Sequence, residues 1–332
     1  MKIIRVILAS FIAVSVLVTI FFGRYKIAEN PKGIAEGYKG IITLWQVDSF
    51  EGGQGSRKQF LLDVARDFER KNQGVLVMVV NQTEESIEEN YKQGIMPDLI
   101  SFGAGINVQN VNEINIEKSF IGGNIGNKTY ALPWCRGGYA LIYNNKLTDG
   151  KYSENDRIII GQKGYTEPLI SLMLEGIKSN NFEVKRPLDA YVEFTAGKTP
   201  YFLGTQRDVV RLSRRGLEAG IIPLTEYNDL YQYISITAND GMKKYYAEKY
   251  VEYLLSEQVQ KSLSKICMMS AFYSVQFNEI GLNEMQSVQI KKTISAFSDK
   301  NVLKDLTETS KTWLKDGKKI EELYSKIQIL NV

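Results

Sequence analysis

The chain begins with an apolar segment between basic residues. Positions 6–22 carry no charge, with two basic residues before them and two shortly after. A short basic start followed by an apolar run is typical of a secretory signal, and this run is about as long as the shortest helix that spans a bilayer. Neither a small-x-small cleavage site nor a lipoprotein-type cysteine follows it. We therefore predict that residues 1–30 form an uncleaved signal anchor, with a cleaved signal peptide as the alternative.

Beyond this segment, short apolar runs alternate with helical patterns. Runs rich in β-branched residues at 41–45, 75–80 and 99–102 predict buried strands. Between them, apolar positions across 60–68 recur at the spacing of one helix face, and 86–93 can form a short polar helix. This order of strands and helices predicts an α/β fold with a parallel sheet covered by helices.

The rest of the chain continues the alternation. Apolar runs predict further strands at 140–143 and 157–160. Helices are expected in four places: from the N-cap residue Thr166 followed by Pro168, from Pro187 to about Gly197, over 241–255 with a restart at Ser256, and in the charged tail at 308–327.

Composition and charge narrow the chemistry. The 332 residues include no histidine, which excludes His-based triads and His-ligated metal sites, and the two cysteines are too few for a four-thiolate zinc site. The net charge of +3 arises in residues 1–28, which hold four basic residues and no acid, so 37 basic and 38 acidic residues remain, a net of −1. We expect no nucleic-acid partner, metal or cofactor.

Four motifs, in order along the chain, carry a family resemblance. They are ITLW at 42–45 with a helix ending in DFERKN at 67–72, GIMPDLI at 94–100, YALPW at 130–134 with GYALIYNN at 138–145, and FTAGKTPYF at 194–202 with YAEKYVEYLLS at 246–256. Behind an export segment, these motifs resemble the extracellular solute-binding proteins of ABC importers (family 1, the sugar-binding branch, type II periplasmic-binding-protein-like). The resemblance covers roughly residues 38 to 330.

The resemblance implies a two-lobed α/β fold with a hinge, in which the ligand lies in the cleft between the lobes. By the family's topology, lobe one takes residues 38–132 and 228–266, and lobe two takes residues 133–227 and 267–332. Closure of such lobes is a hinge motion, and a ligand favours it only by binding the closed form better than the open one.

The loop after the first predicted strand is the leading candidate for ligand binding. It carries Trp45, Asp48, Glu51 and Gly53, and it leaves the carboxyl end of the strand, where open α/β sheets bind ligands. An aromatic ring can cover the apolar face of a sugar, carboxylates make directed bonds to hydroxyls, and glycine lets the backbone approach closely. A flexible loop with a glycine turn is the alternative.

Other candidates follow a later strand or lie at the crossings between lobes that the resemblance implies. Ser101 and Phe102 end a strand and can supply a hydroxyl and backbone contacts, or simply precede a turn. Trp134, Arg136 and Tyr139 lie at the first crossing and Tyr231 near the return crossing, while Tyr201 and Arg207 are further candidates around the end of the fourth motif. Trp134 can stack on a sugar or pack in the hinge, and Arg136 can pair with an acid or reach an anionic ligand.

The two cysteines also lie near crossings by the same topology. An exported pair can form a disulfide, and a bond between Cys135 and Cys267 would restrain the hinge. We favour the alternative of two buried thiols that behave as small hydrophobic groups, because a locked hinge works against ligand capture.

Together, these features predict a monomeric, membrane-tethered protein that captures a sugar, oligosaccharide or other small polar solute for ABC permease subunits. It would lie on the extracellular face of the cell membrane, anchored by residues 6–22, or be secreted if the segment is cleaved. The alternative is a surface sensor or scaffold that retains the fold and partners a membrane receptor. An enzyme acting on glycans is disfavoured, because the sequence shows no pair of carboxylates across a cleft.

Overall fold

The computed structural model describes residues 38–50, 54–115, 120–239, 241–316 and 329–331. The predicted anchor at 6–22 lies outside these residues. Among the helices that are described, none combines the length and the apolar character needed to cross a membrane.

Five strands form the first sheet, in the order β2–β1–β3–β12–β6. Their bounds are β1 Gly40–Val47, β2 Val75–Gln82, β3 Leu99–Phe102, β6 Leu132–Arg136 and β12 Tyr231–Ile236. The parallel pairing of β1 with β2 and β3 confirms the prediction from strand–helix alternation, whereas β12 runs antiparallel to β3 and β6. The carboxyl ends of β1 and β3 therefore emerge side by side.

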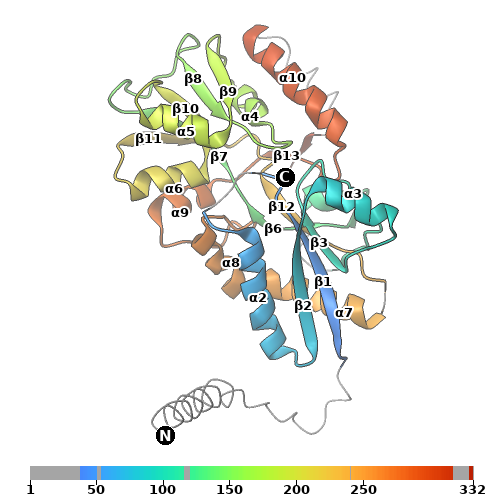
Figure 1. The fold of residues 1–332 in the computed structure, drawn as a ribbon. Coiled ribbons are helices and arrows are strands. Elements are labelled where there is room, and N and C mark those ends of the chain that lie inside the picture. The colour runs from blue at the N-terminus through green and yellow to red at the C-terminus, as the bar shows by residue number, and fades with distance from the viewer. Residues whose placement is uncertain (1–37, 51–53, 116–119, 240, 317–328, 332) are drawn as a thin grey trace, which may run out of the picture. The chain divides into compact units, whose positions relative to one another are not determined.

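Side chains along β1 point alternately to the two faces of the first sheet, and each face packs against a helix. Ile42 and Leu44 are buried on the face where α2 (Arg57–Lys71) packs its apolar stripe. On the other face, Trp45 lies beside Tyr91 of α3 (Glu84–Lys92), with ring centroids 5.8 Å apart. Burial of each such side chain contributes roughly 1.5–3 kcal/mol. Figure 1 shows α2 and α3 flanking these strands.

Five further strands form the second sheet, in the order β11–β7–β10–β8–β9. Their bounds are β7 Tyr139–Asn144, β8 Ile158–Gly161, β9 Phe182–Lys185, β10 Tyr201–Thr205 and β11 Ala219–Pro223. β8 is parallel to β9 and β10, and β7 is antiparallel to β10 and β11. The helices that accompany this sheet are α4 Pro168–Leu174, α5 Pro187–Thr195, α6 Gln206–Arg214 and α9 Ile280–Ser287.

The other elements are short connections or helices from the later part of the chain. They are η1 Ile121–Gly123, β4 Asn124–Ile125, β5 Lys128–Thr129, α7 Gly241–Leu254, α8 Glu257–Lys261, η2 Ser262–Ile266, β13 Lys292–Ile294, α10 Lys300–Asp316 and β14 Ile329–Asn331. α10 packs against α4, as Figure 1 shows.

Two helix starts differ from their predictions. The helix expected from Thr166 begins at Pro168, because the Thr166 hydroxyl donates to the Lys163 carbonyl and caps no helix amide. The tail helix begins at Lys300, not at residue 308, because the Asp299 carboxylate accepts the amide of Asn301 and so caps the helix start.

Sheet membership changes at Gly137 and Gly138, between β6 and β7, and changes back between β11 and β12. β6, up to Arg136, therefore belongs to the first sheet. The lobe ranges implied by the family resemblance stay a prediction. What the sheets establish is that the chain crosses between two α/β halves more than once.

Candidate functional site

The carboxyl end of β1 forms the first part of the candidate site. Arg57, the first residue of α2, donates through Nε to Asp48 Oδ1 at 2.8 Å and through an η nitrogen to the Phe50 carbonyl at 2.5 Å. Its guanidinium also lies over the Phe50 ring, 4.4 Å from the centroid. The Asp48 side chain remains 45% exposed. The buried Arg57 side chain therefore holds this loop in place, while the Asp48 carboxylate is still partly exposed to solvent.

The loop that follows β8 packs closely against the carboxyl end of β1. A Cβ atom on Gly164 would lie 2.4 Å from the Ser49 carbonyl oxygen, and a Cβ on Gly105 would lie 2.7 Å from the Tyr165 ring. Gly164 and Gly105 also have φ of +69° and +87°, which favour glycine. We call this contact between Ser49–Phe50 and residues 162–167 the junction, because it joins segments from the two sheets.

Charged side chains hold the junction together on one side. Lys300, at the start of α10, contacts Glu84 at 2.6 Å and Glu88 at 2.9 Å on α3. Tyr165 donates its hydroxyl to Glu84 Oε2 at 2.8 Å. All three carboxylate contacts are partly exposed, so solvent screens them and they add little to stability.

Replacing Gly164 with Ala should loosen the junction. The new methyl group would overlap the Ser49 carbonyl, so the loop must move away from β1. Gly197→Ala is the matched control, because Gly197 has a similar φ of +71° but no atom within 4 Å of the place where a methyl group would lie. Hydrogen exchange followed by mass spectrometry should show faster exchange across 162–167 only in Gly164→Ala. Equal exchange in both variants would contradict the close contact.

A buried carboxylate pair lies behind the junction. The Glu167 amide donates to Asp229 Oδ2 at 2.7 Å, and the Tyr139 hydroxyl donates to Asp229 Oδ1 at 2.7 Å. Thr307 of α10 donates its hydroxyl to Glu167 Oε1. Glu167 is fully buried, and its Oε2 has no hydrogen-bond partner within the described residues.

This environment raises the pKa of both carboxyl groups. Burial raises the pKa of Glu167 to about 9, and the nearby Asp229 charge adds to this effect. Burial also raises the pKa of Asp229 to about 6, although hydrogen bonds from Tyr139 and the Glu167 amide oppose the rise. Glu167 is therefore a neutral acid at pH 7. The sequence had indicated only a helix start here, and the tyrosines and threonine that complete the network come from distant parts of the chain.

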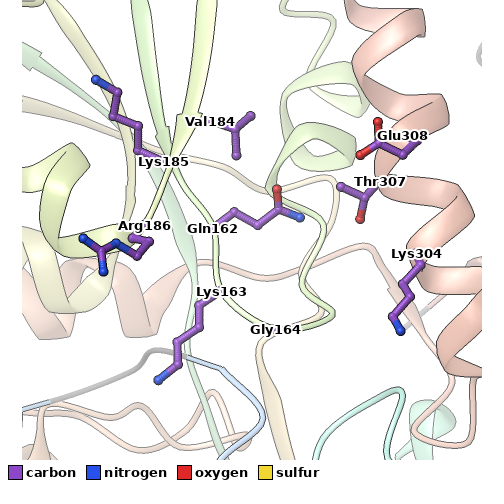
Figure 2. Close-up of a pocket in the computed structure, with 9 residues that line it drawn as sticks. All are labelled: Gln162, Lys163, Gly164, Val184, Lys185, Arg186, Lys304, Thr307 and Glu308. Atoms are coloured by element: carbon purple, nitrogen blue, oxygen red, sulfur yellow. The ribbon is translucent and has the colours of Figure 1, made fainter.

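A cavity of about 440 Å³ lies between β9 and α10, next to the junction (Figure 2). Its lining comes from the loop at 162–164, the end of β9 and one face of α10. Thr307 connects this cavity to the buried pair, because its hydroxyl donates to Glu167. Within the described residues, no group of three or more Cys, Asp or Glu side chains could hold a metal ion.

The structure brings four of the predicted ligand-binding residues into the first sheet's interior. Trp134 is fully buried, stacks on Phe60 with centroids 5.7 Å apart, and donates its indole N–H to Ser101 Oγ at 2.8 Å. Trp45 and Phe102 are also buried. These side chains pack within the first half of the fold, whereas Asp48 is half exposed at the strand end. Glu51 and Gly53 lie outside the described residues.

The remaining candidate residues are dispersed. Arg136 is buried and donates to the carbonyls of Ser270 and Gln286 at 2.9 and 2.8 Å, so the structure shows its guanidinium bonded to the backbone. Tyr139 belongs to the buried carboxylate network. The other three lie on separate elements: Tyr201 on β10, Arg207 half-buried on α6, and Tyr231 on β12 beside Phe120. Their roles in ligand binding stay predictions.

Cys135 and Cys267 are both free and buried in the structure. Burial raises the pKa of each thiol, which keeps both protonated and unreactive at neutral pH.

Comparison with solved structures identifies the fold. Similar chains include the sugar-binding protein MalE from Xanthomonas citri (12% identity, TM-score 0.60). The match covers 84% of this chain and 93% of the MalE chain. The cyclic alpha-maltosyl-1,6-maltose binding protein from Arthrobacter globiformis (11% identity, TM-score 0.60) covers 87% and 97%. The GacH receptor of Streptomyces glaucescens (14% identity, TM-score 0.55), solved also with acarbose, covers 84% and 93%.

The chain therefore has the α/β fold of sugar-binding solute-binding proteins, which confirms the predicted resemblance at the level of the fold. No protein-family profile matches the sequence, and no curated protein matches it.

Proposed function

We propose that this protein is an extracellular solute-binding protein, tethered by residues 6–22, that captures a sugar or oligosaccharide and passes it unchanged to an ABC permease. The observation that carries the proposal is the fold, which it shares across most of its length with several sugar-binding proteins. The junction supports the same function, because segments of both sheets meet where open α/β sheets bind ligands.

In this proposal the described structure is the closed arrangement. Gly164 lies against the Ser49 carbonyl, and Lys300 bridges to α3. A sugar would enter when the junction opens, and it would favour reclosure only through contacts that the open form lacks. Asp48 is the side chain best placed to bind a hydroxyl, because it is half exposed and already oriented by Arg57.

A sensor or scaffold is the second candidate function, and the packing inside the first half of the fold favours it. The aromatic residues predicted to stack on a sugar are buried against the chain's own side chains. A protein that no longer exchanges ligand could retain the fold as a stable surface for a membrane receptor.

A thermal-shift panel of maltose, maltotriose and other neutral oligosaccharides at millimolar concentration tests the proposal. A ligand present at 100 times its Kd should stabilise the full chain by about 2.7 kcal/mol, which raises Tm by several degrees. Asp48→Asn should weaken binding about 10-fold, because a charged hydrogen-bond acceptor is lost. Asp63→Asn, an exposed change on α2, is the control. A flat panel would favour the scaffold function.

A further inference from the structure

The end of the first half where β1 begins exposes apolar side chains. Ile41 on β1 and Leu76 on β2 are paired neighbours in the sheet and are 50% and 54% exposed, and Met78 on β2 is 49% exposed. Side chains two residues apart on a strand share one face, so these three lie together on one face of the sheet. α3 packs on this face near Trp45 but is too short to cover the whole strand, because its nine residues span about 14 Å whereas the eight residues of β1 span about 26 Å.

The start of α7 adds aromatic residues at the same end, where Figure 1 shows α7 beside β1. Tyr246 of α7 stacks on Tyr38, the first described residue, with ring centroids 5.4 Å apart. Tyr245 is 48% exposed and Met242 is 47% exposed. Tyrosine is enriched where proteins meet a bilayer surface, because its ring is apolar and its hydroxyl stays hydrated. We call the surface formed by Tyr38, Ile41, Leu76, Met78, Met242 and Tyr245 the base.

Lysine side chains surround the base. Lys39 is exposed and makes no ion pair within the described residues. Lys92 ends α3 and is exposed, and the Lys71 ammonium at the end of α2 lies 4.4 Å from the centroid of the Tyr253 ring. Such groups attract an anionic surface. A second copy of the chain would bring the same lysines against one another, so the charge of the base favours lipid over self-association.

The described structure begins at the base. Residues 23–37, fifteen in number, separate Tyr38 from the proposed anchor at 6–22. A chain of fifteen residues spans at most about 50 Å, so an anchored protein keeps its base near the bilayer. Tethering through a short chain gives an effective concentration in the millimolar range, so individually weak apolar and electrostatic contacts suffice for docking.

We propose that the base docks on the surface of a bilayer that contains anionic phospholipid, with its apolar and tyrosine side chains entering the headgroup layer and the lysines contacting lipid phosphates. The inference rests on the proposed function in one respect, that residues 6–22 anchor the chain. β1 runs from the base to the junction, so docking holds the junction about 26 Å from the lipid, the length of this strand. The contact is reversible and leaves the junction accessible to solute while the protein is tethered.

Fluorescence quenching of the full chain in vesicles tests the proposal. A polarity-sensitive nitrobenzoxadiazole label at Met78→Cys reports on the base, and the same label at Val192→Cys, 55% exposed on α5 of the second half, is the control. Cys135 and Cys267 are buried, so the label reacts with the introduced thiol. In vesicles of phosphatidylglycerol and phosphatidylcholine, a nitroxide carried on the lipid headgroup should quench most of the emission at position 78 and little at position 192.

Substitutions at the base separate the electrostatic and apolar contributions. Lys39→Gln should lower the ratio of docked to free protein about fivefold in anionic vesicles and leave it unchanged in pure phosphatidylcholine. High salt should act in the same direction as Lys39→Gln, because it screens exposed charges. Leu76→Glu should abolish most of the quenching, because it places a carboxylate against anionic lipid. Leu188→Glu, 58% exposed on α5, should not, and Lys39→Gln keeps the test decisive if Leu76→Glu fails to fold.

Flotation of the vesicles distinguishes this inference from the anchor itself. A chain that floats with the vesicles but is quenched equally at both label positions keeps the anchor and overturns docking of the base. A chain that does not float overturns the anchor and the docking together. Quenching at position 78 that neither Leu76→Glu nor Lys39→Gln reduces overturns the assignment of this surface. Emission that shifts with the ratio of protein to lipid but is not quenched by the nitroxide identifies a second copy as the occupant and overturns the lipid.

Discussion

Between pH 5 and pH 9 the free energy of unfolding should fall by several kcal/mol, and Glu167→Gln should remove most of this fall. Burial raises the pKa of Glu167 to about 9 in the folded protein, far above the value of an unfolded glutamate. The folded state therefore holds a proton that the unfolded state releases. The resulting stability is fully present below pH 4.5 and is lost progressively as pH rises toward 9.

Asp229 adds a smaller loss over a lower range. Its pKa of about 6 means that its contribution is lost between roughly pH 4 and pH 6 and changes little above that. Lys311 and Glu308 of α10 act on Glu167 in opposite directions, so they alter the shift less than burial does. The slope between pH 6 and pH 9 consequently reports on Glu167.

Urea denaturation at pH 5, 7 and 9 measures this effect. Glu167→Gln should be about as stable as the parent at pH 5 and several kcal/mol more stable at pH 9, because glutamine retains the acceptor for Thr307 without a titrating proton. Glu154→Gln, an exposed change on the same half of the fold, should leave the slope unaltered. Equal slopes for the parent and Glu167→Gln would mean that Glu167 is ionised when folded.

Trp134→Ala should lower the free energy of unfolding by about 4 kcal/mol. The side chain is fully buried, stacks on Phe60 and donates to Ser101, so its removal leaves a cavity and takes away one of the two hydrogen bonds that the Ser101 hydroxyl accepts. Trp134→Phe should lose only about 1 to 2 kcal/mol, because the ring contact with Phe60 survives and only the indole hydrogen bond is lost.

The same pair of variants distinguishes a packing residue from a sugar-stacking residue. If Trp134 lined a ligand site, Trp134→Ala would weaken sugar binding with little loss of stability. The burial of the indole predicts the reverse order, measured by urea denaturation alongside a sugar titration. A loss below about 1 kcal/mol in Trp134→Ala would show that the indole is not in the core.

Local patterns predicted the first part of the fold because each element there has one clear face. The β-branched run that became β1 and the apolar stripe of α2 could be recognised without knowing their partners. β12 could not be recognised in this way, because the polar residues Gln232 and Ser235 interrupt its apolar pattern. Both are fully buried, and their side chains donate to the Val47 and Tyr130 carbonyls, so a central strand carries polar residues that distant segments satisfy.

The candidate site, too, could be predicted from the sequence only in part. The sequence located a polar loop at the carboxyl end of a strand, and Asp48 is half exposed there. It also proposed Trp134 and Arg136 from their positions at crossings, but exposure at a crossing depends on what packs over it. In the structure α2 and the segments around Ser270 and Gln286 cover these residues.

The sequence by itself determined the order of strands and helices, the absence of histidine chemistry and a body that is nearly neutral beyond its basic N-terminal segment. Only the tertiary structure decided that Glu167 is a neutral acid, because burial and the charge of Asp229, 62 residues away, raise its pKa more than the hydrogen bond from Thr307, 140 residues away, lowers it. Hydrophobic periodicity is a local property of the chain. Desolvation and charge pairing depend on which distant segments meet, and no short stretch of sequence contains that information.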